Sequence, residues 1–323
     1  MEACIRNGVH YLDITGEIAV FELAQALGEQ ARRAGVLLCP GVGFDVVPTD
    51  CVAVALREAL PGATRLALGF DSRGGMSPGT ARTSVEGLAQ GGRIRREGRL
   101  VPVPLAWRTR RIDFGDGEKL AMTIPWGDVS TAFHSTGIQD IEVYLPASPR
   151  LVARLKRLNW VRPLLGLPPV QGLLKRRIGK TVRGPGAARR AATPTFVWGE
   201  AADDTGRTVT ARIKVANGYD LTVHAAIGIA LSVAFGRCQH VLGGVGLAIA
   251  QVGVQDLVGH GEHAVALAVA QGDHGQVLVR HHGMVEDEAG HTAAVGDDPV
   301  AVEVFHEPAQ RGSITPGGHG QVH

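Results

Sequence analysis

The segment Gly35–Asp50, GVLLCPGVGFDVVPTD, decides the fold class of this chain. Val36–Cys39 is a short apolar run that indicates a buried strand, and Pro40–Pro48 is a glycine-bearing loop. Thr49 and Asp50 can cap the helix that follows. In a sheet built from such units, ligands bind beyond the carboxyl ends of the strands, where this loop would lie.

A second strand and helix precede this segment. His10–Ile14 (HYLDI) is rich in strand formers, Thr15-Gly16-Glu17 interrupts it, and apolar residues then recur at helical spacing over Phe21–Ala31. Gly35 stops that helix in the usual C-terminal position. The order of strand, helix, strand and helix predicts a parallel sheet covered by helices.

Three segments resemble glycine-rich phosphate-binding motifs, but each lacks one glycine that its motif requires. A dinucleotide-binding turn needs three glycines in the spacing GxGxxG, and a phosphate loop needs a glycine ahead of its Gly-Lys-Thr. The departures are Val46 after Gly41 and Gly43, Ile249 after Gly244 and Gly246, and Leu174 ahead of Gly179-Lys180-Thr181. We reject all three as phosphate cradles.

Length and composition are those of a globular protein. The 323 residues suit two domains, 45% are hydrophobic, and the net charge of +2 gives no indication of nucleic acid. Met1–Val9 lacks the apolar core of a signal peptide, and the four cysteines show no paired spacing, so we expect a cytoplasmic protein. Cys39 and Cys51 are interpreted as small core residues, with a catalytic thiol as the alternative.

The middle of the chain predicts a mixed domain. Expected elements are a strand at Thr64–Phe70, a helix at Gly79–Gln90, and strands over Leu100–Tyr144 with turns at Gly115-Asp116-Gly117 and Trp126-Gly127-Asp128. Two strands, TFVWGEA and TVTARIKVA, then alternate around a turn at residues 203–206, and residues 218–220 open an apolar helix.

A block of positive charge interrupts this domain. Between Ala147 and Ala192 the chain has twelve basic residues and no acidic one, with Trp160 and several leucines among them. Basic amphipathic segments of this kind suit an anionic membrane surface or an acyl-chain substrate. A solvated, partly disordered connector is the alternative, which Pro163 and Pro168 favour.

The tail from Leu231 differs from the rest, because it is rich in Gly, Val and His and contains no Lys, Trp or Tyr. Low-complexity composition, with possible disorder, explains it most simply, and we expect a shifted reading frame of a GC-rich gene. No metal site is expected, because its histidines share no ligand register. Those considered are His260, His263, His274, His281, His282 and His291. The apolar run Val241–Val254 is too short to span a bilayer.

An ordered set of motifs resembles the saccharopine dehydrogenase-like oxidoreductases, and most closely the bacterial trans-acting enoyl reductases. The resemblance covers about Cys4–Ile229. Its motifs are HYLDITGE, PGVGFDVVPTD, SPGTARTSVEG, PWGDVSTAFHSTGI, GPGAARRAATPTFVWGEAADDTG and NGYDLTV.

This resemblance implies a fold and an activity. The fold is α/β, with an incomplete Rossmann-like parallel sheet and a mixed α+β second domain. The activity is NAD- or NADP-dependent hydride transfer to a C=C or C=N bond of an acyl or lipid-like substrate. The expected divisions are 1–60 for the remnant of the NAD(P)-binding domain, 61–146 with 193–230 for the substrate domain, 147–192 for a basic connector and 231–323 for the tail.

Two departures from the family pattern accompany the resemblance. The family's opening strand and GATG-like turn would lie before Met1, and its Gly-x-x-Thr-Pro segment does not follow the helix at Leu221. We therefore expect an N-terminally truncated chain with a divergent tail. Without the turn, the pyrophosphate loses its main backbone donors, so cofactor binding by this chain is in question.

Site residues follow from the motifs. The resemblance places Thr15, Gly16, Gly41, Gly43, Phe44 and Asp45 at the cofactor. His134 is the first choice for a proton donor, with Asp128 and Asp45 as further catalytic candidates. A structural role for His134 and helix capping by Asp45 and Asp50 remain alternatives. Thr80, Ser84 and Trp126 are expected to contact substrate, with helix capping as the alternative for Thr80 and Ser84.

Three hypotheses about function remain open. The chain is a working reductase of a small acyl or lipid-like substrate, a catalytically inactive homologue that retains lipid or membrane-surface binding, or a defective gene product. A homodimer and peripheral membrane contact through 147–192 are further expectations about partners, and nucleic acid is not expected.

Overall fold

The computed structural model describes residues 1–73, 75, 77–182 and 184–234, together with four short strands at 276–278, 284–286, 292–294 and 301–307. In chain order its elements are α1 (Glu2–Arg6), β1 (Tyr11–Leu12), α2 (Ile18–Arg33), β2 (Leu38–Cys39), α3 (Val47–Ala59), β3 (Arg65–Ser72), α4 (Pro78–Gly87), β4 (Gly92–Arg96), β5 (Arg99–Val103), β6 (Thr109–Asp113), β7 (Glu118–Ile124), α5 (Asp128–Thr136), β8 (Asp140–Pro146), α6 (Pro149–Leu158), η1 (Asn159–Val161), α7 (Arg162–Leu165), α8 (Pro168–Thr181), α9 (Ala187–Ala192), β9 (Thr195–Ala202), β10 (Thr208–Val215), α10 (Gly218–Ala234), β11 (Gln276–Leu278), β12 (Met284–Glu286), β13 (Thr292–Ala294) and β14 (Ala301–Glu307).

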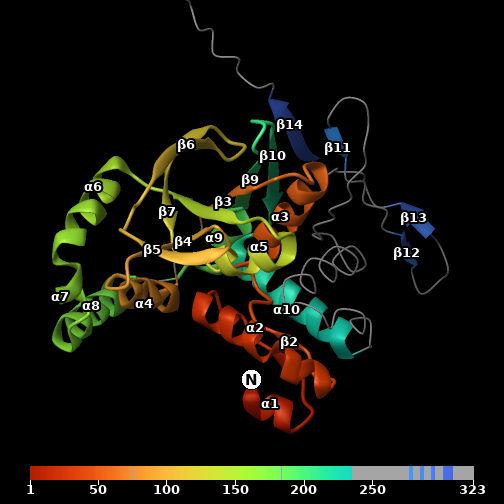
Figure 1. Ribbon diagram of the computed structural model, residues 1–323, viewed down its shortest axis with the longest axis horizontal. Coiled ribbons are helices and arrows are strands. Elements are labelled where there is room, and N and C mark those ends of the chain that lie inside the picture. The colour runs from red at the N-terminus through yellow and green to blue at the C-terminus, as the bar shows by residue number, and fades with distance from the viewer. Residues whose placement is uncertain are drawn as a thin grey trace, which may run out of the picture.

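A small parallel sheet begins the chain, near the red end of the ribbon in Figure 1. β1 and β2 pair with Tyr11 opposite Leu38 and Leu12 opposite Cys39, and α2 connects them. The helix buries one apolar face, made by Phe21, Ala24, Leu27 and Ala31. Gly35 follows it with a φ of +65°, a backbone conformation that glycine adopts without strain. The predicted strand–helix–strand order is confirmed.

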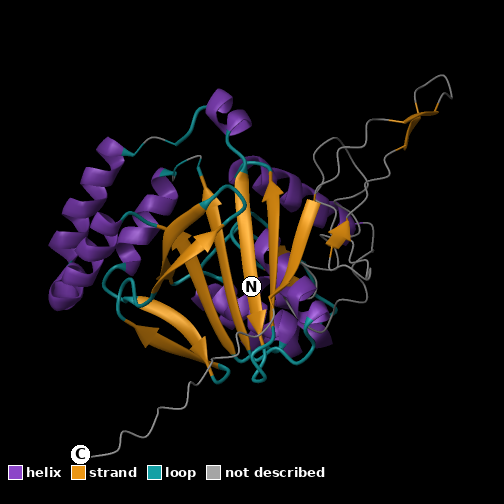
Figure 2. Ribbon diagram, turned by 90° about the horizontal axis from the view of Figure 1, so that it is seen from above, coloured by secondary structure: helices purple, strands orange, loops and turns teal. Residues whose placement is uncertain are grey.

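The second sheet is larger and mixed. Ten strands are joined in the order β11-β14-β10-β9-β3-β8-β4-β5, and the β6–β7 hairpin pairs with β8 through β7. β3 and β8 run parallel, whereas the other neighbours in this sheet are antiparallel. Figure 2 shows these strands side by side in one twisted layer. The predicted α/β class, with a parallel unit beside a mixed domain, is confirmed by this arrangement.

The two faces of the large sheet are covered differently. Along β9, Val197, Gly199 and Ala201 face α3, as the twofold alternation of a strand requires. Gly199 permits a close approach, because a Cβ atom there would lie 2.6 Å from Val52 Cγ1 and 2.7 Å from Leu56 Cδ1. The opposite face carries a second cluster, made by Ile112, Phe114, Ala121, Tyr144 and Trp198.

Two expectations about local structure were wrong. Leu100–Tyr144 does not consist of strands alone, because the turn at residues 126–128 leads into α5, whose Val129 and Ala132 are buried one helical turn apart. Thr49 and Asp50 do not cap α3, because that helix begins at Val47, with Val46 as its N-cap residue. Both side chains are instead buried inside the first turns of the helix.

The expected basic connector folds largely into helices. We call α6, η1, α7 and α8 the helical arm, residues 149–181; it lies on the left in Figure 1. Val152 of α6 packs against Ala106 and Met122, and Asn159 exchanges hydrogen bonds with the backbone of Leu105 at 2.8 and 3.1 Å. The arm is thereby fixed to the large sheet.

The tail contributes strands to the large sheet. β14 pairs antiparallel with β10, and β11 pairs with β14. Most of residues 235–323, including Val241–Val254 and the six histidines considered as metal ligands, lies outside the described residues.

Candidate active site

Asp13 joins the two loops that follow β1 and β2. Its Oδ1 accepts hydrogen bonds from the backbone N–H groups of Thr15 at 2.9 Å and Gly41 at 3.0 Å, and its carbonyl oxygen accepts one from Val42. Its Oδ2 accepts the Tyr11 hydroxyl at 2.5 Å, and this bond raises the pKa of Tyr11 to about 12. One carboxylate at the end of β1 thus fixes both loops.

The glycines of the second loop are required by packing within the protein. Gly41 has a φ of +78°, and a Cβ atom there would lie 2.6 Å from the ring of Phe21. A Cβ atom on Gly43 would lie 2.9 Å from the Thr222 methyl of α10, whose hydroxyl accepts the Phe44 N–H at 3.0 Å. The space beside both glycines is therefore filled by α2 and α10, so their contribution to cofactor binding remains a prediction.

Three loops converge beside Asp45. A Cβ atom on Gly16 would lie 2.6 Å from Asp45 Oδ2, and one on Gly127 would lie 3.3 Å from the Gly16 carbonyl oxygen. The indole Nε1 of Trp126 donates to the Asp45 carbonyl oxygen at 2.5 Å. The loops after β1, β2 and β7 consequently meet at one place, although they come from two different sheets.

The Asp45 carboxyl is the titratable group at this meeting point. Burial raises its pKa from the usual value of an aspartate to about 6. Within the described part of the chain, no side chain or backbone N–H donates a hydrogen bond to it. A partly buried carboxyl without a protein donor, titrating near neutrality, is suited to bind or exchange a proton with a ligand.

Aromatic side chains line the same region. The rings of Phe44 and Phe70 meet edge to face with centroids 5.4 Å apart, and those of Phe70 and Trp126 are tilted with centroids 4.9 Å apart. Phe44 and Trp126 are only partly buried, so the cluster offers aromatic surface next to Asp45.

Two further carboxyls are completely buried behind this region, between α3 and α5. Asp50 accepts a hydrogen bond from the Ser135 hydroxyl at 2.6 Å, and burial raises its pKa to about 7. Burial and the neighbouring charges of Asp50 and Asp45 raise the pKa of Asp128 well above its usual range, while the Thr49 hydroxyl offsets part of that rise. The hydroxyl's own hydrogen bond, however, goes to the Val46 carbonyl at 3.1 Å. Both carboxyls therefore hold a proton more tightly than an ordinary aspartate does, and Asp128 lies inside the protein.

His134 belongs to a different cluster. Its Nε2 lies 4.0 Å from Glu22 Oε1, and Glu22 accepts hydrogen bonds from Arg95 at 2.8 Å and Ser130 at 2.6 Å. Burial lowers the pKa of His134, with Glu22 opposing and Arg95 reinforcing that effect. Among the described residues, no hydrogen bond or ion pair joins His134 to Asp45 or Trp126.

The hydroxyls of Thr80 and Ser84 are engaged within α4. Ser77 caps this helix by accepting the Thr80 N–H at 2.9 Å, and its hydroxyl also lies 2.9 Å from the Thr80 hydroxyl. The Ser84 hydroxyl donates to the Thr80 carbonyl at 2.8 Å. Both side chains are exposed, and their contact with substrate remains a prediction.

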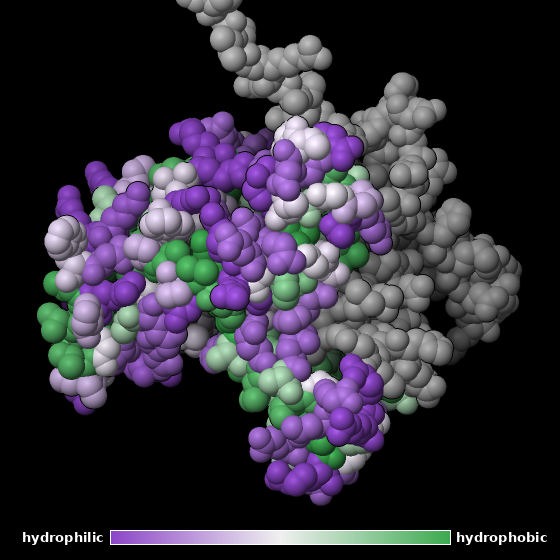
Figure 3. Space-filling view, in the orientation of Figure 1, coloured by the Kyte–Doolittle hydropathy of each residue, from purple (hydrophilic) through white to green (hydrophobic). Residues whose placement is uncertain are grey.

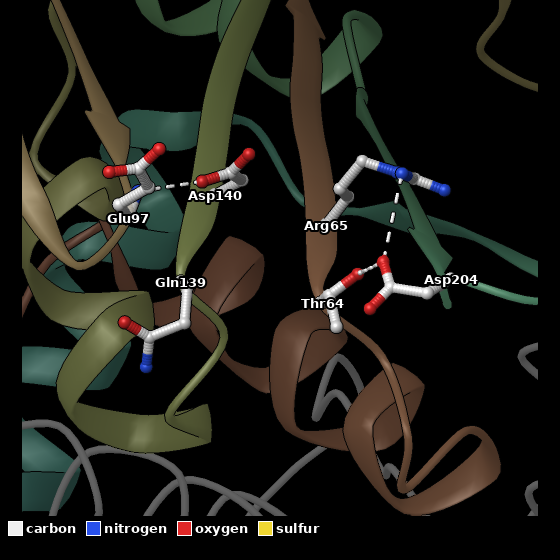
Figure 4. A pocket seen from close by; sticks show the side chains of 6 residues that line it. All are labelled: Thr64, Arg65, Glu97, Gln139, Asp140 and Asp204. Atoms are coloured by element: carbon white, nitrogen blue, oxygen red, sulfur yellow. Dashed lines mark hydrogen bonds and ion pairs between the residues drawn. The ribbon is translucent and has the colours of Figure 1, made fainter.

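A separate hollow of about 320 Å³ lies at the opposite ends of the strands (Figure 4). It is lined by Thr64, Arg65, Glu97, Gln139, Asp140 and Asp204. Asp204 accepts the Thr64 hydroxyl at 2.8 Å, and Asp140 accepts the Glu97 N–H at 2.7 Å. Arg65 opens β3 whereas Phe70 lies near its end, so five residues, or about 17 Å of strand, separate this hollow from the aromatic cluster.

The described residues also bear on a reactive thiol, on metal ligands and on a membrane-spanning helix. Cys51 is buried, and burial together with the charge of Asp50 raises the pKa of its thiol to about 12. Across 1–73, 77–182 and 184–234, His, Cys, Asp and Glu form no group of three or more that could hold a metal ion. None of the helices in the described ranges has the length and apolar run that crossing a bilayer requires.

The structure brings together part of the predicted site. Gly16, Asp45 and Trp126 meet, with Phe44 in the adjoining aromatic cluster, whereas His134, Thr80 and Ser84 have their partners elsewhere. Sequence reasoning missed Asp13 and Phe70. The position of Asp13 near the end of the predicted strand His10–Ile14 was a usable signal, but the packing of Phe70 between Phe44 and Trp126 depends on tertiary structure.

Comparison with known proteins gives a limited similarity. No protein-family model matches the chain. Over 115 residues it is 30% identical to the saccharopine dehydrogenase-like oxidoreductase of Pongo abelii, and it has the same identity to that of Homo sapiens. The match covers 32% of this chain and 27% of each relative, so the chain spans about a quarter of the length of the curated relatives it matches.

The structure is also similar to a solved one. Apo histidine-tagged saccharopine dehydrogenase (L-Glu forming) from Saccharomyces cerevisiae matches with a TM-score of 0.45 and 10% sequence identity, over 79% of this chain and 78% of that chain. The sequence similarity and the motif resemblance agree on saccharopine dehydrogenase-like proteins.

Proposed function

We propose that this chain is an NAD(P)-dependent oxidoreductase of the saccharopine dehydrogenase-like type that reduces a C=C or C=N bond of an acyl or lipid-like substrate. The observation that supports this most is the meeting of Gly16, Asp45 and Trp126 at the carboxyl ends of β1 and β2. Ligands of α/β sheets bind at this end of parallel strands.

The residues present fit the nicotinamide end of such a cofactor. Phe44, Phe70 and Trp126 offer aromatic surface beside the Asp45 carboxyl, to which no described residue donates a hydrogen bond. Thr15 and Gly16 lie at the start of α2, which has no side-chain cap. Thr15, Gly16, Phe44 and Asp45 would hold that end of the cofactor, which supplies the hydride when bound. The N–H groups of Thr15 and Gly41 already donate to Asp13.

Asp45 is the group that we assign to proton exchange in this function. Its pKa of about 6 lets the carboxyl gain and lose a proton near neutrality. Asp128 and His134 stay as further candidates for acid–base roles, with Asp128 buried behind the loops and His134 held beside Glu22.

Titration of the full chain with NADPH and with NADH, followed by nicotinamide fluorescence, tests the proposal. We expect saturable binding that depends on pH near the pKa of Asp45 and loses this dependence in Asp45→Asn. Asp204→Asn, at the opposite end of the strands and 78% exposed at its side chain, is the matched control. Absence of binding at millimolar cofactor would contradict the proposal.

A catalytically inactive homologue that binds lipid or a membrane surface is the second candidate. The exposed apolar side chains of the helical arm favour it. Oxidation of NADPH with a panel of enoyl thioesters and imines distinguishes the two, because only the first candidate turns over the cofactor.

A further inference from the structure

The helical arm presents large apolar side chains to solvent. Trp160 in η1 is 91% exposed, Leu173 in α8 is 69% exposed, and Leu164 in α7 is 56% exposed. Figure 3 shows apolar surface at the outer end of the arm, by α7 and α8. A tryptophan that is almost wholly exposed to water is unusual, because its large apolar surface stays unburied. Exposed apolar patches of this kind mark contact surfaces.

The charge of the arm is of one sign. Residues 147–192 contain no acidic residue. Lys175 pairs with Glu86 of α4 at 2.5 Å, and Arg190, beyond the arm, lies 3.5 Å from Asp220. Several other cations form no ion pair with any described residue: Arg150, Arg154, Lys156, Arg157, Arg176 and Arg177. The arm therefore combines unneutralised positive charge with exposed Trp and Leu.

The arm is also held in place, so this surface is presented by folded structure. α6 is anchored through Val152, and Gln171 of α8 donates to the carbonyl oxygens of Val85 at 3.1 Å and Leu165 at 2.6 Å. Because anchoring residues point inward, Trp160 and Leu173 are left on the outside.

We propose that the helical arm docks on an anionic membrane surface, with Trp160, Leu164 and Leu173 entering the interface and the arm's cations contacting lipid headgroups. Charge complementarity selects the occupant, because the nine cations of the arm, with no acidic residue among them in sequence, suit an anionic leaflet. Trp and Leu suit the boundary between headgroups and acyl chains. A nucleic acid would use the cations but would leave the exposed leucines in water. The proposal is independent of the oxidoreductase function.

Sedimentation of the full chain with vesicles tests this docking. We expect binding to phosphatidylcholine vesicles that contain phosphatidylserine, weaker binding at high salt, and little binding to phosphatidylcholine alone. Trp160→Ala should weaken binding about tenfold, from loss of buried apolar area, and Lys156→Glu should weaken it about fivefold or more, from loss of a cation. Both side chains are exposed, so folding should be retained.

Matched control variants test whether vesicle binding depends on the helical arm. Leu173→Ala should weaken binding, whereas Leu23→Ala, on the exposed face of α2, should not. Lys214→Glu, on β10, is the control for Lys156→Glu. Failure to bind anionic vesicles at low salt overturns the proposal, as does binding that Trp160→Ala leaves unchanged. Duplex DNA that binds more tightly than the vesicles, and as tightly to the Trp160→Ala variant as to the wild type, would assign the arm to nucleic acid instead.

Discussion

The indole Nε1 of Trp126 donates a hydrogen bond to the backbone carbonyl oxygen of Asp45, 2.5 Å away. Trp126 follows a strand of the large sheet and Asp45 follows a strand of the small one. The bond therefore ties the two sheets together at the place where a cofactor is proposed to bind.

Trp126→Phe should keep the aromatic contact with Phe70 and lose this bond. We expect the free energy of unfolding to fall by about 1 kcal/mol, the usual net value of one hydrogen bond. Urea unfolding of wild type and Trp126→Phe measures this difference in free energy. Trp107→Phe, at a side chain that is 43% exposed, should change stability by less than about 0.5 kcal/mol. Equal effects of the two substitutions would show that the Asp45 contact contributes nothing.

Gly41→Ala should destabilise the protein more than Gly35→Ala. Both glycines have positive φ, but a Cβ atom on Gly41 meets Phe21 at 2.6 Å, while one on Gly35 has no atom within 4 Å. Backbone strain alone costs about 1 kcal/mol, and overpacking adds about 1–3 kcal/mol at Gly41. Thermal and urea unfolding of both variants tests the difference, and equal losses would refute the packing explanation.

Stability should depend on pH through Asp50. Its pKa of about 7 in the folded protein lies above the value near 3.9 of an unfolded chain, so the folded state binds the proton more tightly. The stabilisation from this group is complete below the unfolded pKa and is lost as the pH rises through the folded one. Between about pH 5 and pH 6, wild type should lose about 1.4 kcal/mol per pH unit relative to Asp50→Asn, and the slope should fall to about half as the pH reaches 7.

Urea unfolding of wild type and Asp50→Asn across this range measures that slope, with Asp204→Asn as the control for loss of an exposed carboxylate. Parallel pH profiles of wild type and Asp50→Asn would contradict the assignment. The direction for Asp128 is the same, because burial also raises its pKa.

Loss of Glu22 alone should destabilise the protein more than replacement of both Glu22 and Arg95. Arg95 is 4% exposed and donates to Glu22, to the Val129 carbonyl at 2.6 Å and to the Gly98 carbonyl at 2.7 Å. Glu22→Ala leaves this cation without its anion and should cost about 2 kcal/mol, allowing for the 40% exposure of Glu22. A double-mutant cycle with Arg95→Met should recover part of that loss; strict additivity would show no coupling.

Helices and strands whose apolar residues recur at a regular spacing could be predicted from the sequence. The spacing of Phe21, Ala24, Leu27 and Ala31 indicated α2, and the alternation around the turn at 203–206 indicated the β9–β10 hairpin, in which Val197 faces Ile213. α5 was missed because it lies between strands and because its Trp-Gly-Asp start was interpreted as a turn within a run of strands. Its buried Val129 and Ala132 were the available signal.

The site was less predictable because its parts depend on contacts between distant segments. Gly41 and Gly43 look like cofactor glycines in sequence, and their need for glycine becomes clear only with Phe21 and Thr222 in place. Asp50 looks like a cap, yet the fold buries it against Ser135. Local sequence patterns could not show that Asp13 contacts Gly41, 28 positions later in the chain, or that Asp45 contacts Trp126, 81 positions later.

Gly199 lies outside the candidate site but sets how closely α3 packs on β9. The absence of a side chain at this position lets α3 settle on β9 through Val52 and Leu56, and α3 is continuous with the loop that carries Asp45. A larger residue would require the side chains of Val52 and Leu56 to move, and we expect part of that movement to reach the loop through α3. If the proposed cofactor binds there, substitutions at position 199 should change its affinity without contacting it.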